Sequence, residues 1–309
     1  MILQKGFHPM IQFPLSNFAK DPSFPFCIQY GSHEQTLYRH SHVDFSELVI
    51  VLDGKATHIV EEEHYHISKG DVFVISNDTT HAYENAVNFH ICNIMFSPSF
   101  LTAAAPELSQ TAGFQALFVL EPECSHSYRF CSRLKLDSAQ FSKVYSDVFM
   151  LYQEYTEEQI GWHTAVQAEF LKLVVMLSRM YDVEHITQED SLLRLAPALA
   201  YIEQHYDQPC SLSELAELTY YSERHFIRLF QELYSCNPTT YVKKLRMQKA
   251  QELLATTQLP ITEIAARCGY PDSNYFSRIF KQQNNMTPKQ YRIHHKDWNW
   301  KRLHTTLLP

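Results

Sequence analysis

The stretch Phe226-Ile-Arg-Leu-Phe230 recurs fifty residues later as Phe276-Ser-Arg-Ile-Phe280. At the same offset, Pro238-Thr-Thr-Tyr241 recurs as Pro288-Lys-Gln-Tyr291. In each copy two phenylalanines stand four positions apart, so on a helix they share one face and can be buried together. The C-terminal third of the chain therefore predicts a helical unit that is present twice.

Each copy has the parts of a helix-turn-helix. A short helix containing Ala216 or Ala265 precedes a tight turn, and a second helix follows the turn. Gly269 suits a positive φ angle in the second turn, whereas Tyr220 stands at the equivalent place in the first, which predicts a differently built first turn. The residues expected to cap these helices are Ser211 or Ser213, Ser222, Thr262 and Asp272.

The helix faces opposite the phenylalanines carry side chains that suit DNA. Arginine matches guanine and asparagine matches adenine in the major groove, while serine and lysine mostly bond phosphate. A merely solvated polar face is the alternative, but two such helices at a fixed spacing in a basic region favour DNA contact. The predicted DNA-binding residues are Glu223, Arg224, Arg228, Gln231, Ser273, Asn274, Ser277, Arg278 and Lys281.

The charge of the chain is divided between its two parts. Residues 1–191 contain 11 lysines and arginines against 24 acidic residues, a net charge of −13. Residues 192–309 contain 15 against 10, a net charge of +5. The front part is therefore acidic and the back part basic, which indicates separate tasks and allows the back part to displace the counterions condensed on DNA.

The composition excludes several classes of protein. The 309 residues leave room for two domains, and 45% hydrophobic with 19% charged residues is typical of a globular protein. Neither a signal peptide nor a membrane-spanning run is expected, and the seven scattered cysteines are typical of reduced cytoplasmic thiols. Without a phosphate loop, a nucleophile elbow or a required cofactor, the sequence does not predict an enzyme.

Residues from about 26 to 96 predict short strands that build an all-β barrel or sandwich. Glu47–Leu52 is one of them, and Asp53-Gly54 after it is a turn signal. Further along, apolar residues at spacings of three and four predict helices over 141–152 and about 162–181. Their apolar stripes suit either packing against the barrel or a dimer seam.

Histidines gather in the predicted β region. His40 and His42 stand two apart, so on a strand they point to the same face, and Glu47 and His81 can complete a set of three imidazoles and one carboxylate. Such a set can bind Zn, Ni, Mn or Fe, line a ligand pocket, or simply pack. The candidate effector-binding residues are His40, His42, Glu47 and His81, with Tyr38, Arg39, His58, Tyr65, His66 and Asn93 as weaker candidates.

Four segments of the back part carry a family resemblance. Arg246–Leu254, Ile261–Tyr270, Asp272–Lys281 and Thr287–Arg292 resemble the AraC/XylS transcription regulators. The resemblance implies that one long helix, about Thr239–Leu254, joins two helix-turn-helix units that enter successive major grooves, and that the protein contacts RNA polymerase. The family usually has glycine where this chain has Cys236-Asn237 and Asn285-Met286, and asparagine tolerates the left-handed conformation.

The front part carries a second resemblance. The spacing of its histidines, Glu47 and its glycines is similar to the cupin pattern, with Ser76 and Asp78 as departures. Within the family, His40–Phe96 resembles the L-rhamnose regulators most, notably at Asp44–Val51. That resemblance implies a small-molecule effector, with a monosaccharide as the expected class, held in the barrel.

Together these observations predict a multi-domain protein: an all-β cupin barrel with flanking helices, then an all-α domain of two helix-turn-helix units joined by a long helix. The expected function is a ligand-responsive, homodimeric DNA-binding regulator that activates carbohydrate-utilisation genes. The alternative, a metal-dependent cupin dioxygenase or sugar isomerase, leaves the basic repeat unexplained. The expected divisions are a cupin-like domain (1–136), a helical dimerisation region (137–182), a linker (183–191), a DNA-binding domain (192–295) and a tail (296–309).

Overall fold

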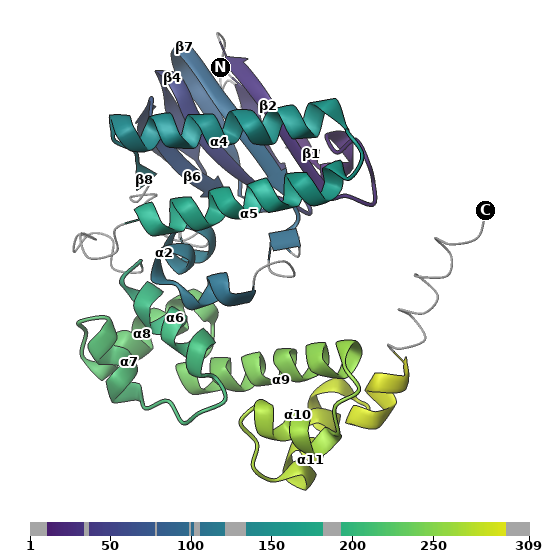
Figure 1. The fold of residues 1–309 in the computed structure, drawn as a ribbon. Coiled ribbons are helices and arrows are strands. Elements are labelled where there is room, and N and C mark those ends of the chain that lie inside the picture. Colours follow the sequence, from purple (N-terminus) through teal and green to yellow (C-terminus); the bar gives the residue numbers. More distant parts are fainter. Residues whose placement is uncertain are drawn as a thin grey trace, which may run out of the picture. The chain divides into compact units, whose positions relative to one another are not determined.

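The chain folds into two compact units, Met1–Ala200 and Tyr201–Pro309. In the computed structural model, the first unit is a β-sheet with helices on it, and the second consists of helices (Figure 1). The boundary between the units falls inside one helix, α6 (Ala196–His205). The structure describes residues 11–33, 37–77, 79–98, 100–101, 106–120, 134–181 and 193–294.

In the described part of the first unit, eight strands form one sheet, in the order β1-β3-β7-β4-β6-β8, with β2 on β7 and β5 on β4. Among the described strands, β1 pairs in parallel with β3, and the other pairs are antiparallel. The strands are β1 (Ile11–Phe13), β2 (Phe26–His33), β3 (Leu37–His42), β4 (Ser46–Val60), β5 (Glu63–Ser68), β6 (Asp71–Ile75), β7 (His81–Phe96) and β8 (Leu134–Lys135).

The two long strands β4 and β7 form the middle of the sheet and differ from the sequence prediction. Asp53-Gly54, expected as a turn, lies inside β4, where Gly54 has a φ of 74° and the register against β7 shifts. A glycine with positive φ inside a strand accommodates a bulge, which bends the strand without ending it. The bend lets one strand follow the curvature of the whole sheet.

Two helices, α4 (Ser138–Glu157) and α5 (Trp162–Met180), pack against each other and lie across one face of the sheet (Figure 1). The predicted stripe of α5 is buried, as expected for core packing. The stripe of α4 divides: Val144 and Val148 are buried, whereas Tyr145 and Phe149 are about half exposed. Shorter helical segments of this unit are η1 (Leu15–Asn17), η2 (Pro106–Gln110), α2 (Ala112–Phe114), η3 (Gln115–Leu120) and η5 (Leu193–Leu195).

The second unit contains the two predicted helix pairs. In Figure 1 the long helix α9 joins them, and it corresponds to the helix expected over 239–254. In each pair the second helix buries its two phenylalanines completely. The helices after α6 are α7 (Leu212–Leu218), α8 (Glu223–Tyr234), α9 (Pro238–Thr256), α10 (Ile261–Arg267) and α11 (Ser273–Asn284), followed by a helical segment over 288–294.

Side-chain caps start most of these helices. Ser211 caps α7 in a capping box with Glu214, Ser222 caps α8, and Asp272 caps α11. Helix α10 differs from the prediction because it begins after Pro260, without a side-chain cap, and so includes Thr262. Proline fixes the extended conformation that precedes a helix and thereby starts it without a hydroxyl.

The two turns have the same conformation, which makes the prediction of a differently built first turn wrong. Tyr220 has a φ of 57° and Gly269 a φ of 76°. In both turns the next amide, of Tyr221 or Tyr270, donates to the carbonyl five residues before it. The Tyr220 side chain is 89% exposed, so it meets no obstacle, and the left-handed strain of a residue with a Cβ is the whole cost.

Replacing Tyr220 by glycine is therefore expected to stabilise the second unit. Glycine removes the left-handed strain of about 1–2 kcal/mol. Part of this gain is offset because glycine loses more conformational entropy than tyrosine when the chain folds. We expect a net increase of about 0.5–1 kcal/mol in the free energy of unfolding, measured by urea denaturation. Tyr221→Gly is the control: Tyr221 does not have a positive φ, so glycine there should destabilise the protein.

The helix ends that resemble the family pattern also use left-handed residues. Asn285 has a φ of 56° at the end of α11, as the resemblance implies. In the first repeat the left-handed residue is Ser235, with a φ of 51°, rather than Cys236 or Asn237. Asn237 instead caps α9 by accepting a hydrogen bond from the Thr240 amide.

Candidate ligand pocket and nucleic-acid interface

The first unit encloses a pocket of about 320 Å³. Polar groups converge in it from β2, β3, β4 and β7, while apolar and aromatic side chains supply much of its wall. A volume and lining of this kind suit a small molecule. The lining residues are Ile11, Phe13, Phe18, Gln29, Gly31, His40, His42, Phe45, Glu47, His81, Tyr83, Asn93 and Met95.

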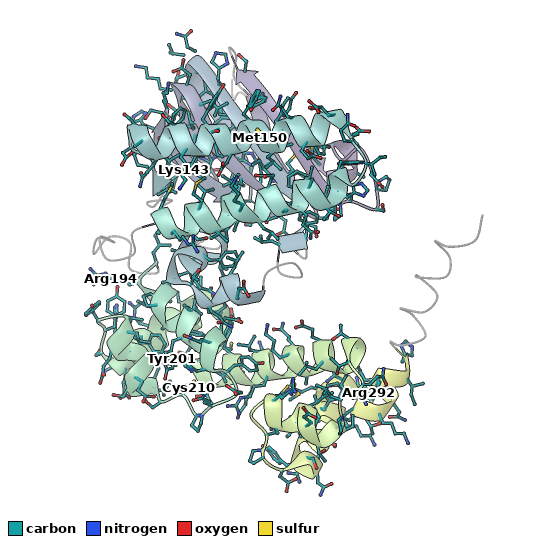
Figure 2. All side chains as sticks on the ribbon, viewed as in Figure 1. Lys143, Met150, Arg194, Tyr201, Cys210 and Arg292 are labelled. Carbon is teal, nitrogen blue, oxygen red and sulfur yellow. The ribbon has the colours of Figure 1, made fainter. Side chains whose placement is uncertain are left out.

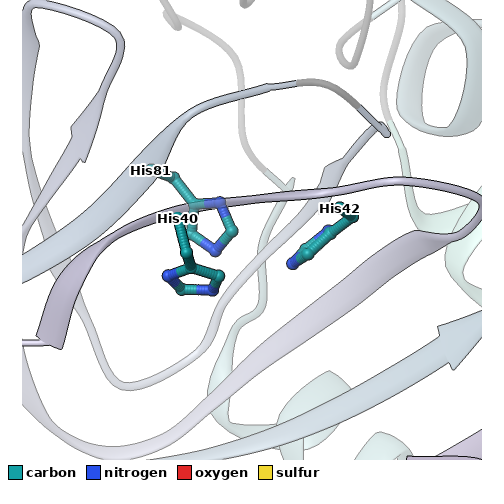
Figure 3. Close-up of side chains that lie close together, drawn as sticks. All are labelled: His40, His42 and His81. Atoms are coloured by element: carbon teal, nitrogen blue, oxygen red, sulfur yellow. The ribbon is translucent and has the colours of Figure 1, made fainter. Parts of the chain in front are cut away.

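Three imidazoles lie together at the pocket, and Figure 3 shows His40, His42 and His81 close to one another. His40 on β3 pairs in register with His81 on β7, and alternation along β3 brings His42 to the same face. The candidate ligand nitrogens all lie within 4.8 Å of one another. The Glu47 carboxylate from β4 completes the cluster, 3.4 Å from His42 Nε2 and 3.6 Å from His81 Nε2.

Burial governs the protonation of this cluster. It raises the pKa of Glu47 to about 8 and lowers the pKa of His42 to about 3, to which the neighbouring His40 contributes. The pKa of His81 lies well below its ordinary value, first because of burial and then because of the other histidines. At neutral pH the imidazoles of His42 and His81 are therefore uncharged, so each of these two offers a lone pair to a hydroxyl group or a metal ion.

Neighbouring groups hold the cluster in place. His81 Nδ1 lies 3.4 Å from the Thr79 carbonyl, which favours a proton on Nδ1 and leaves Nε2 with its lone pair toward Glu47. The His42 ring stacks on Phe45, with the ring centroids 4.2 Å apart. Asn93 also lines the pocket, and its buried Oδ1 has no hydrogen-bond partner among the described residues.

Several candidates from the sequence do not line this pocket. Arg39 is exposed and pairs with Glu62. His58 is fully buried between the rings of Phe73 and Tyr83. Of the weaker candidates, Tyr65 packs against the core and His66 is exposed, while the side chain of Tyr38 falls outside the described part.

The sequence prediction also missed residues that line the pocket. Gln29 and Gly31 come from β2, which pairs with β7 next to Asn93 and Ile91. Ile11 and Phe13 come from the three-residue strand β1. The alternation of β2 was a usable signal, because residues two apart on a strand share a face, whereas a strand as short as β1 leaves no pattern.

The second unit presents the predicted DNA-binding residues on the outside of α8 and α11. Phe226, Phe230, Phe276 and Phe280 are fully buried, so the opposite sides of these helices face outward. The exposed residues are Glu223, Arg224, Arg228, Gln231, Asn274, Arg278 and Lys281, and Ser273 and Ser277 are half-buried.

The two central arginines are held in different ways. The guanidinium of Arg228 pairs with Glu232 one turn further along α8, at 3.1 Å. The guanidinium of Arg278 lies over the ring of Tyr275, 5.3 Å from its centroid. Both contacts restrain a long side chain on the exposed face, and they make the two halves chemically different despite their common backbone.

Comparisons with known proteins agree with this division. Residues 23–174 match the AraC-like ligand binding domain, and residues 215–293 match a helix-turn-helix domain. The HTH-type transcriptional activator RhaS of Escherichia coli O1:K1 / APEC is 26% identical over 288 residues, which cover 92% of this chain and 96% of the relative. RhaS of Enterobacter sp. (strain 638) is 28% identical over 261 residues, covering 84% and 88%.

Solved structures resemble the chain as well. The C-terminal domain of the two-component response regulator yesN from Fusobacterium nucleatum is 36% identical, covers 31% of this chain and 93% of that chain, and has a TM-score of 0.29. ToxT from Vibrio cholerae is 12% identical, covers 87% and 98%, and has a TM-score of 0.33.

The described helices include none that is long and apolar enough to cross a membrane.

Both parts of the chain match a family model: the pocket domain matches the AraC-like ligand binding domain, and the paired helix-turn-helix units match the helix-turn-helix domain. The alignment with the curated relatives spans nearly the whole length. The chain therefore belongs to the AraC family of transcription regulators, which are DNA-binding proteins and not enzymes.

Proposed function

We propose that this protein is a ligand-responsive transcription activator whose helices α8 and α11 enter successive major grooves of a promoter. The observation that carries the proposal is the pair of exposed polar faces on α8 and α11, within a single basic unit. The effector binds in the pocket of the other unit and favours one arrangement of the protein on DNA over another. The curated relatives are named activators, which supports this sign of regulation.

Arg228→Ala and Arg278→Ala test the DNA-binding faces. Each substitution is expected to weaken binding by about 1–3 kcal/mol if the arginine reads a base. Binding is measured by titrating the full chain into a duplex that it has selected from randomised DNA. Arg267→Ala is the matched control, because Arg267 is exposed on α10 and bonds only to Glu263 in the described structure. Unchanged affinity for both variants would refute the assignment.

Because the two recognition faces differ in sequence, each subunit should bind a non-palindromic half-site. Glu223-Arg224-His225 on α8 stands where Ser273-Asn274-Tyr275 stands on α11. Different side chains at equivalent positions read different base pairs. Selection from randomised DNA gives this result directly, and two identical sequence blocks would contradict it.

The proposed effector is a monosaccharide. The neutral imidazoles of His42 and His81, together with Asn93 and Gln29, can exchange hydrogen bonds with hydroxyl groups, while Phe13 and Phe45 can pack on the apolar face of a sugar ring. The resemblance of His40–Phe96 to the L-rhamnose regulators supports the same class. The regulated genes would then serve carbohydrate use.

Melting temperatures measured against a panel of monosaccharides test this assignment. A sugar that binds the folded state stabilises it by about 2.7 kcal/mol at a hundred times its dissociation constant. His42→Ala should abolish the shift and leave DNA affinity unchanged, whereas His66→Ala, on an exposed site of β5, should keep it. A shift that His42→Ala retains would remove His42 from the effector site.

A second candidate is that the pocket holds a divalent metal ion. His40, His42 and His81 place three nitrogens within 4.8 Å of one another, and Glu47 can add a carboxylate oxygen. A tetrahedral site with bonds of about 2.0–2.1 Å needs the nitrogens about 3.3 Å apart, so the side chains would close in slightly. Zn²⁺, Ni²⁺, Mn²⁺ and Fe²⁺ suit this set of ligands.

Adding Zn²⁺ or Co²⁺ to chelator-treated protein separates the two candidates. Stoichiometric binding that His81→Ala removes and His66→Ala retains would establish the metal. If neither Zn²⁺ nor Co²⁺ binds to the wild-type protein, the metal site is refuted and the sugar remains the proposed ligand of the pocket.

The protein is further proposed to act in the cytoplasm as a homodimer that contacts RNA polymerase. The exposed apolar residues of α4, Tyr145, Phe149 and Met150, supply a surface for a second copy of the chain. Sedimentation at several concentrations tests the dimer, and Phe149→Glu should shift it toward monomer. A dimer that is unaffected by this substitution would place the contact elsewhere.

A further inference from the structure

The side chain of Arg246 joins three separate pieces of backbone. Its Nε donates to the Tyr206 carbonyl at 2.6 Å, its Nη2 to the Gln208 carbonyl at 3.0 Å, and its Nη1 to the Gly269 carbonyl at 3.1 Å. Arg246 belongs to the middle of α9 and is partly buried. It is therefore placed for contacts inside the unit, and it takes no part in the proposed DNA-binding faces.

These three carbonyls lie just beyond the C-terminal ends of two helices. Tyr206 and Gln208 follow α6, and Gly269 follows α10. Figure 2 labels Tyr201 on α6 and Cys210 in the loop after it, which bracket the first two. Helix C-termini carry partial negative charge and unpaired carbonyls. One guanidinium thus satisfies the negative ends of two helices that come from different halves of the unit.

Gly269 shows how closely the two pieces approach. A Cβ atom on this glycine would lie 2.5 Å from the Asp207 carbonyl oxygen and 2.9 Å from Arg246 Cζ. The loop after α6 therefore packs directly against the second turn and leaves no space for a side chain. At the equivalent turn of the first repeat Tyr220 is 89% exposed, so only the second repeat carries this junction.

We propose that Arg246 is a positioning residue that fixes the second recognition helix relative to the first. The loop after α6 leads into α7 of the first half, and Gly269 lies three residues before Asp272, which caps α11. Helix α9 already links the halves covalently, and the Arg246 junction adds a second tie between them. With two connections, the covalent one through α9 and the hydrogen bonds of Arg246, the relative orientation of the two halves is fixed more tightly than by α9 alone. The inference rests on the proposed binding of α8 and α11 to DNA.

The test compares Arg246→Gln with the wild-type full chain on a duplex that the wild type has selected from randomised DNA. Hydroxyl-radical footprints report each half-site separately, and Arg228→Ala and Arg278→Ala identify which half belongs to which helix. We expect Arg246→Gln to weaken protection of the α11 half-site roughly tenfold or more, about 1.4 kcal/mol, with the α8 half-site retained. Arg267→Gln removes an exposed arginine from the same half of the unit and should leave the protection of both half-sites unchanged.

Arg246→Lys separates positioning from charge. Lysine keeps the positive charge but cannot reach three carbonyls with a planar fork. If Arg246 only attracted phosphate, lysine would restore the footprint; we expect that it does not. This variant also decides the matter if Arg246→Gln fails to fold, as judged by circular dichroism.

Gly269→Ala breaks the same junction from the other side. It should give the same selective loss, and the double variant Arg246→Gln/Gly269→Ala should be no worse than the more severe single variant, because both remove one interaction. Additive effects, equal weakening of both half-sites, or full rescue by Arg246→Lys would each overturn the proposal. If the wild type protects only one half-site, the proposed binding of both helices fails instead.

Discussion

Replacing Phe276 by alanine is expected to lower the free energy of unfolding of the second unit by about 3–5 kcal/mol. The Phe276 ring is completely buried and packs near Tyr270 and Phe280, with ring centroids 5.5 and 5.7 Å away. It lies at the centre of a core to which α9, α10 and α11 all contribute. A small domain has only about 5–15 kcal/mol of stability in total, so the second half should lose most of its order.

Hydrogen exchange followed by mass spectrometry localises this effect. Protection should be lost over α10 and α11, and the α11 half-site should disappear from the footprint. Tyr275→Ala is the control for stability. The Tyr275 ring lies next to Phe276 in the sequence but is about half exposed, so its removal leaves no internal cavity. Phe226→Ala should produce the corresponding loss in α7 and α8. A cost below about 1 kcal/mol for Phe276→Ala would show that the core refills the space.

The architecture of the second unit was predictable because its signals are local. Phenylalanines four apart identify the buried side of α8 and α11, and the predicted caps Ser211, Ser222 and Asp272 mark the starts of α7, α8 and α11. Hydrogen bonds within one turn of chain set these features, so neighbouring residues suffice to predict them. The junction at Arg246 was not predictable, since it joins residues 40 and 23 positions apart.

The conformation of Tyr220 shows where a local rule fails. Positive φ favours glycine, so tyrosine predicted another kind of turn, yet the helix-turn-helix geometry imposes the same hydrogen bonds on both repeats. A strain of about 1–2 kcal/mol is small compared with the packing of a buried helix pair. Tertiary structure therefore determines the backbone there, and the side chain remains exposed.

The pocket was predictable only in part. The alternation His40-Ser-His42 placed two imidazoles on one face, and His81 and Glu47 do lie beside them. His58 also alternates on its strand, but the bulge at Gly54 and the curvature of β4 direct it into the core instead. The curvature of a sheet depends on bulges and on strands paired far apart in sequence, so the residues facing a pocket require the structure.

Glu47→Gln is expected to make the first unit more stable and at the same time unresponsive to its effector. Glu47 is buried beside His42 and His81, at distances longer than the roughly 2.7–2.9 Å of a strong charge-assisted hydrogen bond. Burial raises its pKa from the ordinary 4.5 to about 8, so the folded protein disfavours the ionised carboxylate. Glutamine has the same shape without that charge, and we expect a gain on the order of 2 kcal/mol.

The stability gained by Glu47→Gln should depend on pH, and the raised pKa of Glu47 determines in which direction. Between about pH 4.5 and 8 the unfolded chain has released the Glu47 proton while the folded protein still holds it, so wild-type stability falls as the pH rises through this window. Glutamine does not titrate, and the advantage of Glu47→Gln should therefore grow from pH 5 to pH 8. The lowered pKa of His42 destabilises the fold below about pH 6.5 in both proteins, so its effect largely cancels in the comparison.

Urea unfolding at pH 5 and pH 8 measures the gain, and the monosaccharide panel measures the response. Glu63→Gln is the matched control, because Glu63 is exposed at the start of β5 and its replacement should change neither quantity. A stabilised Glu47→Gln that still binds the effector would mean that the carboxyl group lowers stability without contributing to recognition of the ligand. A destabilised variant would mean that Glu47 is ionised and paired in the folded protein. Only a gain in stability with a loss of response fits a buried carboxyl group retained for the ligand that it binds.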